Sequence, residues 1–141
     1  MAKLHRLPEI ALIDMGDFVG GTLNYLRAHP VPRVTLAGGF GKLAKLASGA
    51  LDLHSKSSQV DVARLAAMLA ELGASPELVE RARSAAGAGE ALALAREAAL
   101  PLADLVAQRA RATVLAALAG EIAVDVVVFA RDGALLGRAG P

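Results

Sequence analysis

The sequence predicts an α/β fold: a βαβ-type layered sheet with helices, a helical insertion and a C-terminal β-hairpin. Two short apolar runs, residues 9–15 and 33–37, flank a segment whose apolar residues have helical spacing. A long alanine-rich stretch, residues 85–119, follows, and the chain closes with a β-prone run and an Asp-Gly turn. Alternating strands and helices are typical of a parallel sheet covered by helices.

The first βαβ unit is predicted from the apolar runs and the breaks between them. Residues 9–15 (EIALIDM) predict a strand that ends at Gly16, and residues 17–29 predict a helix that ends before Pro30. Residues 33–37 predict the second strand. We expect the two strands to be parallel and their connection to be right-handed.

Three glycines follow the second strand and predict a tight turn into a helix. Gly38, Gly39 and Gly41 form this turn, and residues 42–48 predict a short helix with its leucines on one side. After a polar loop, Ser58 begins an S-x-x-D capping box that opens a helix over residues 60–72.

The second half predicts more helices and then a hairpin. Gly73 ends the preceding helix, and Ser75-Pro76 opens the next one as N-cap and first residue. Spaced Leu and Val residues in 85–119 favour packed helices over a disordered linker. Residues 122–130 (IAVDVVVFA) predict a strand, which Asp132-Gly133 turns into a hairpin with residues 134–137.

Composition bounds the class of protein. The chain has 141 residues, 55% of them hydrophobic and 3% aromatic, with a formal net charge of +1 and no cysteine. We expect a single α/β domain with an aliphatic core, no nucleic-acid partner and no membrane span. The absence of cysteine excludes disulfides and thiolate metal sites, and the histidines lack metal-ligand spacing, so we expect no protein-bound metal. A cytoplasmic location is the default expectation.

The predicted sheet is thin for the number of helices. Two parallel strands and a hairpin leave few strands on its N-terminal side. The sequence therefore predicts part of a larger domain, completed by a missing N-terminal region or by a partner copy.

The glycine segment is the first candidate site. Gly38-Gly39-Phe40-Gly41-Lys42 fits neither the phosphate-loop pattern nor, fully, the dinucleotide-binding pattern. A helix start that follows glycines can let a ligand approach the backbone closely, and its N–H groups favour an anion. An ordinary strand-to-helix turn explains the same residues equally well.

Lysines near this helix start add positive charge. Lys42 and Lys45 are one turn apart and share a face opposite the leucines. Positive charge at a helix N-terminus is unfavourable unless an anion binds, so the pair favours a carboxylate ligand. A solvated helix face is the plainer interpretation.

Three further polar residues are candidate ligand contacts. His54 and Ser55 lie in a hydroxyl-rich loop, where the imidazole can transfer a proton or contact a ligand. Asp17 follows the first strand, at the end where ligands bind in open α/β sheets, although it also suits the N-cap of the next helix. No catalytic residue is assigned.

At these residues the sequence resembles a known family. MGDFVGG (15–21), AGGFGKLAKLASG (37–49), LHS (53–55) and VVVFARDGALLG (126–137) look like the C-terminal half of the CbiD family of cobalt-precorrin-5B C-1 methyltransferases. The chain departs from the family pattern at Gly39, where a His is common, and at Leu53, where a Thr is common. Family members are also longer at the N-terminal side.

The resemblance implies methyl transfer from S-adenosylmethionine to C-1 of a cobalt-containing tetrapyrrole in cobalamin biosynthesis. Under this hypothesis Gly38, Gly39 and Gly41 line the ligand crevice, and Lys42 and Lys45 bind the carboxylates of the macrocycle. Asp17 borders the crevice, and His54 and Ser55 contact the ring.

The alternative is a truncated, non-catalytic domain that binds the precorrin or the cofactor. Binding without turnover by the isolated chain would favour it.

Overall fold

The computed structural model describes residues 10–14, 33–47, 62–118, 123–130 and 132–140. Four strands lie in these ranges: β1 (Ile10–Asp14), β2 (Arg33–Gly39), β3 (Ala123–Phe129) and β4 (Leu135–Ala139). The described helices are α2 (Phe40–Ala47), α3 (Val62–Glu71), α4 (Pro76–Arg83), α5 (Ala88–Glu97) and α6 (Leu102–Leu118).

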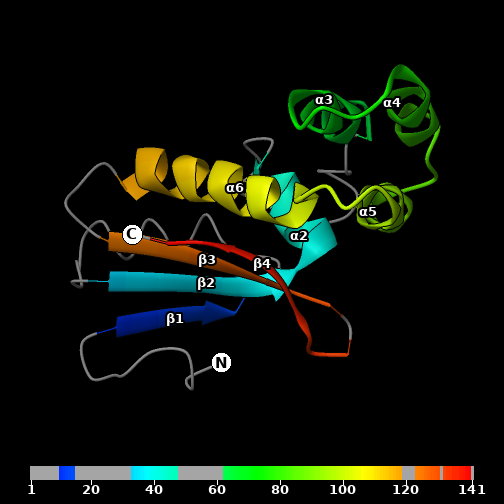
Figure 1. Cartoon of the computed structure of the whole chain (residues 1–141). Coiled ribbons are helices and arrows are strands. Elements are labelled where there is room, and N and C mark those ends of the chain that lie inside the picture. Colours follow the sequence, from blue (N-terminus) through cyan, green and yellow to red (C-terminus); the bar gives the residue numbers. More distant parts are fainter. Residues whose placement is uncertain (1–9, 15–32, 48–61, 119–122, 131, 141) are drawn as a thin grey trace.

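The described strands form one mixed sheet in the order β1-β2-β3-β4 (Figure 1). β1 and β3 both pair with β2 in parallel, and β4 pairs with β3 antiparallel. The predicted α/β class, both predicted parallel strands and the C-terminal hairpin are thus confirmed. Gly133 has a φ of 89° in the turn between β3 and β4, a conformation that glycine adopts at little cost. The predicted helix over residues 17–29 lies outside the described residues.

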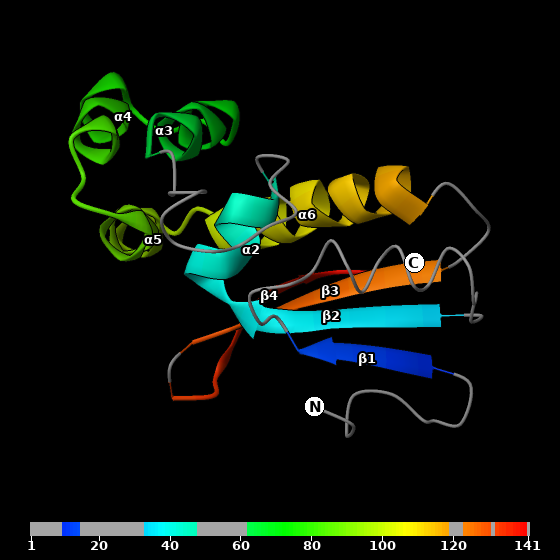
Figure 2. The same cartoon turned by 180° about the vertical axis from the view of Figure 1, so that it is seen from behind.

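Helices cover one face of the sheet and gather beyond one of its ends. α6 packs on β3 and β4, and α2 packs on α6 (Figures 1 and 2). α3, α4 and α5 form a cluster on the side toward which the arrowheads of β1 and β2 point. The helical insertion therefore lies near the carboxyl ends of the parallel strands.

The core between sheet and helices is aliphatic, as predicted. Alternate residues of two strands face the helices, and each is buried because side chains alternate between the faces of a strand. These residues are Val34 and Leu36 of β2 and Val124, Val126 and Val128 of β3. The core continues into every described helix, and Phe40 is the aromatic residue that the described part of the chain contributes to it.

The predicted glycine turn is wrong. β2 continues through Gly38 and Gly39, which pair with Val128 and Phe129 of β3, and α2 begins at the next residue. Glycine has low strand propensity, but pairing with β3 and burial of the strand outweigh it. The expected helix over residues 42–48 accordingly begins earlier, at Phe40, and ends at Ala47.

The other predicted helix boundaries agree closely. The expected helix over residues 60–72 is observed as α3, and residues 85–119 contain α5 and α6. The Ser75 hydroxyl accepts a hydrogen bond from the Leu78 N–H at 3.2 Å, and Pro76 is the first residue of α4. The predicted cap is confirmed. The capping box at Ser58 lies outside the described residues.

A buried polar cluster joins β2 and β3 on the other sheet face. The Asp125 side chain is 1% exposed and accepts a hydrogen bond from the Thr35 hydroxyl at 2.8 Å. The Arg33 guanidinium donates to both carboxylate oxygens, at 3.3 and 3.2 Å. Because a buried carboxylate is costly without such partners, the cluster favours this strand register over its neighbours.

Two helices end in the same backbone motif with different residues at the key position. After α3, Ala74 N–H donates to Leu69 C=O at 3.0 Å, and Gly73 has a φ of 92°. After α5, Leu100 N–H donates to Ala95 C=O at 2.9 Å, and Ala99 has a φ of 57°. Both are Schellman ends, but the second places a side chain in the left-handed region.

We expect Asp125→Ala to lower the free energy of unfolding by about 3 kcal/mol, because it leaves a guanidinium and a buried hydroxyl without their acceptor. Thr35→Val removes one hydrogen bond and should cost about 1 kcal/mol. Urea denaturation of the two variants and of the double variant gives their coupling energy. Equal effects of the two single variants would show that the Arg33 contact contributes little.

We expect Ala99→Gly to raise the free energy of unfolding by about 1 kcal/mol, because it relieves a left-handed alanine at an exposed helix end. Gly73→Ala is the matched opposite change and should lower it by a similar amount. Thermal denaturation measures both. Opposite shifts are the expected result, and destabilisation by Ala99→Gly would contradict it.

Candidate functional site

The carboxyl ends of the parallel strands form a step. The last β1–β2 pair is Asp14↔Ala37, whereas β2 pairs with β3 as far as Gly39↔Phe129. Among the described strands, Gly38 and Gly39 therefore pair with β3 on one side and with no strand on the other. Ligands of open α/β sheets bind beyond such strand ends, so this step is the candidate site.

Buried side chains hold the start of α2 at this step. Phe40 is 6% exposed, and Leu43 and Leu46 are fully buried in the core between α2 and α6. Their spacing places one apolar stripe of the helix inward. Because the helix follows β2 without a loop, the strand end and the helix start form one fixed unit.

The glycines leave the backbone accessible at this unit. A Cβ atom added at Gly39 or at Gly41 would meet no atom within 4 Å, and neither residue has a left-handed φ. Gly39 is exposed, and Gly38 and Gly41 are half-buried. Neither backbone conformation nor packing requires glycine at these two positions, and close approach of a ligand is a remaining reason for it.

The charged residues of α2 itself are both lysines. α2 has no acidic residue in its first turn, and Lys42 is its third residue. The prediction placed both lysines at the N-terminus, but Lys45 lies in the last turn, where the helix dipole favours a cation. The unfavourable placement that indicates an anionic ligand thus applies to Lys42 alone. Both side chains are half-buried. Lys45 lies opposite Leu43, but Lys42 lies one turn before Leu46 and therefore borders the apolar side, so the expectation that both lysines oppose the leucines is wrong for Lys42.

The described structure brings four predicted site residues together: Gly38, Gly39, Gly41 and Lys42 follow one another across the β2–α2 junction. Lys45 lies one turn further along α2. Asp17, His54 and Ser55 lie outside the described residues, so their roles stay predictions.

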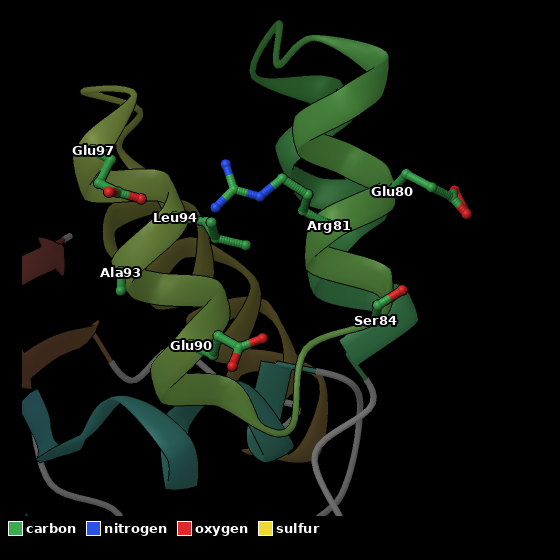
Figure 3. Close-up of a pocket in the computed structure, with 7 residues that line it drawn as sticks. All are labelled: Glu80, Arg81, Ser84, Glu90, Ala93, Leu94 and Glu97. Carbon is green, nitrogen blue, oxygen red and sulfur yellow. The ribbon is translucent and has the colours of Figure 1, made fainter.

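A second hollow lies between α4 and α5 (Figure 3). Arg81 of α4 points toward Leu94 of α5, and Glu90 and Glu97 of α5 flank it. The residues that line the hollow are Glu80, Arg81, Ser84, Glu90, Ala93, Leu94 and Glu97. The carboxylates of Glu90 and Glu97 outnumber the Arg81 guanidinium between the two helices, which disfavours an anionic ligand, and no predicted site residue lines this hollow.

The Asp125 cluster was not predicted, although the sequence carries a signal for it. Asp125 interrupts the apolar strand IAVDVVVFA, and a lone carboxylate in such a strand requires a donor partner. Thr35 and Arg33 supply it near the amino end of β2, whereas the glycine step lies at the carboxyl end. We assign the cluster to the fold and not to the site.

No three His, Asp or Glu side chains of the described residues are placed to hold a metal ion. In the same part of the chain, no helix combines the length and apolar character needed to cross a membrane.

The fold and the step define a class: an α/β chain with a candidate anion site at the carboxyl edge of its parallel strands. The chain belongs to the CbiD family, whose profile, described as "CbiD, C-terminal domain", matches residues 52–140. This bears out the family resemblance found in the sequence.

Curated relatives are named "Cobalt-precorrin-5B C(1)-methyltransferase". The chain is 53% identical to the one from Bradyrhizobium sp. (strain BTAi1) over 137 residues, which is 96% of the chain and 36% of the relative. It is 55% identical to the Rhodospirillum rubrum protein over 92% of the chain and 37% of the relative. It is 46% identical to the Pseudomonas putida (strain GB-1) protein over 99% of the chain and 38% of the relative. The chain thus spans little more than a third of these relatives, and no solved structure matches it.

Proposed function

We propose that this chain is part of a methyltransferase that transfers a methyl group from S-adenosylmethionine to C-1 of cobalt-precorrin-5B in cobalamin biosynthesis. The names of relatives at 46–55% identity support the reaction and the tetrapyrrole substrate. A cytoplasmic location and the role of the chain as the C-terminal portion of the longer enzyme belong to the same proposal.

One observation carries the assignment of the site: open space beside Gly39 and Gly41 adjoins Lys42 in a first helical turn that has no acidic residue. Corrin precursors bear acidic side chains around the ring. The N–H groups at the start of a helix favour an anion such as a carboxylate, and Lys42 lies in that first turn of α2. Gly39 and Gly41 leave room for the macrocycle or its side chains to contact the backbone.

The residues fit an S-adenosylmethionine-dependent reaction that relies on positioning. When bound, S-adenosylmethionine supplies an electrophilic methyl group on a sulfonium centre. The ring carbon needs to be held in line with that methyl group, so orientation provides a large part of the rate enhancement. The chain contributes by binding and orienting the carboxylated ring at the β2–α2 unit. His54 and Ser55 are proposed as polar contacts to the ring, Asp17 as a residue at the edge of the crevice and Lys45 as a second carboxylate partner.

The second candidate is a domain that binds ligand without catalysing the reaction. The limited coverage of the relatives favours it for the isolated chain, because residues of the remaining portion can complete a site. Calorimetric titration of the chain with S-adenosylmethionine, and separately with a carboxylated cobalt corrinoid, distinguishes the cases. Binding of both supports a site within this chain, and binding of the corrinoid alone supports the second candidate. A folded chain that binds neither contradicts the proposed site.

We expect Gly41→Ala to stabilise the fold and weaken binding. Alanine in a helix is favoured over glycine by about 1 kcal/mol, and here the added methyl group meets no protein atom. The same group occupies space that the proposed ligand uses, so corrinoid affinity should fall about tenfold, or about 1.4 kcal/mol. Thermal denaturation and titration measure the two effects.

Gly39→Ala should behave similarly in binding, with an almost unchanged melting temperature. Gly87→Ala is a control outside the site, because its Cβ would also meet no atom within 4 Å. Undiminished binding by both site variants would show that no ligand approaches this backbone.

We expect Lys42→Ala to weaken binding of the carboxylated corrinoid about tenfold or more, because a charge-assisted contact contributes about 1.5–3 kcal/mol. The loss should shrink at high salt, which screens the wild-type contact. Arg96→Ala, an exposed cation in the last turn of α5, is the charge-matched control and should leave affinity unchanged. Equal losses for both variants would indicate a diffuse charge effect in place of a site.

A further inference from the structure

We propose that the outer edge of β1 is a docking surface on which an extended segment from the remainder of the longer protein adds to the sheet. The proposal concerns assembly of the longer protein and does not depend on the methyltransferase activity.

The opposite edge of the sheet is closed by α6. The N–H of Arg138 in β4 donates to the Asp104 carboxylate of α6 at 2.9 Å. A Cβ atom added at Gly137 would lie 2.7 Å from the Asp104 backbone nitrogen, so β4 and the first turn of α6 are in direct contact. A β-bulge beside Phe129 further interrupts this edge. Helix cover and bulges are devices that stop an edge strand from pairing with another strand.

The β1 edge has few of the sequence devices that protect edges, and Asp14 at its carboxyl end is its one charged residue. β1 ends the sheet among the described strands and pairs with β2 in parallel. Its sequence, IALID, contains no Lys, Arg, Pro or Gly. Parallel strands are usually interior, with neighbours on both sides, and an apolar strand left at an edge invites another strand to pair with it.

The length of the relatives indicates the occupant. The chain covers 36–38% of each of the three relatives described above, so most of each protein lies outside it. A segment of the same polypeptide competes at the millimolar effective concentration that a tether provides. A second copy of the chain would have to bind the β1 edge at its ordinary concentration in solution, without the advantage of a tether. We therefore propose the covalently connected segment as the occupant of this edge.

Hydrogen exchange followed by mass spectrometry tests the proposal on two proteins. One is the present chain, and the other is the whole Bradyrhizobium relative, which is 53% identical to it. In the isolated chain about half of the β1 amides, those facing away from β2, should exchange rapidly, because successive residues of a strand alternate in direction. In the whole relative the corresponding amides should be protected at least a hundredfold more.

The amide of Arg138 is the internal control, because its acceptor Asp104 belongs to the same chain. It should be protected in both proteins, and Asp104→Ala should remove that protection. Sedimentation of the isolated chain at several concentrations tests for a second copy.

Three outcomes would overturn the proposal. Fast exchange of the outward β1 amides in both proteins would show an edge that stays open. Protection of these amides in a monomeric isolated chain would show that its own residues cover the edge. Protection that rises with concentration alongside dimerisation, in both proteins, would assign the edge to a second copy.

Discussion

Parallel pairing of β2 with β3 is the constraint on which the other described elements depend. The register from Arg33↔Ala123 to Gly39↔Phe129 joins segments about ninety residues apart, and every described helix lies between them in sequence. Because both strands run the same way, the chain must leave at the carboxyl end of β2 and return to the amino end of β3. α2 makes the departure, and α6 makes the return across the sheet. The helical cluster of α3, α4 and α5 is thereby left near the strand ends where the candidate site lies (Figure 1).

Polar contacts specify this arrangement in a way that the apolar core cannot. Val124, Val126 and Val128 are interchangeable in a core, whereas Asp125 has one position in which Thr35 and Arg33 donate to it. A slip of one residue would turn the carboxylate toward the aliphatic face, at a cost that hydrophobic contacts do not recover. α6 is fixed in the same manner, since Arg111 donates to the Val124 carbonyl at 2.7 Å and Asp104 accepts from the Arg138 N–H.

Sequence reasoning succeeded where the signal was local. Ser75-Pro76 opens α4, and Gly133 turns β3 into β4, because each residue acts on its own stretch of backbone. It failed where a distant strand decided the outcome: Gly38 and Gly39 suggest a turn on their own and become strand residues through pairing with Val128 and Phe129. The Asp125 cluster depends on the same long-range pairing, so the sequence alone could flag the carboxylate without naming its partners. For the site, the sequence alone proposes the contiguous residues Gly38 to Lys42, and their role, like that of Asp17, His54 and Ser55, stays a prediction.

The failed turn prediction strengthens the case for the site. Glycines in a tight turn are explained by their backbone conformation, and nothing more would follow from them. Gly39 instead ends a paired strand and Gly41 lies in a helix, where glycine costs stability and where a methyl group would meet no protein atom. Lys42 lies in the same helical turn, where the helix dipole disfavours a cation. Buried Phe40 and Leu43 hold this junction in place despite both penalties. Adjacent residues that each lower local stability, for different reasons, are expected where the residues bind a ligand and do not stabilise the fold.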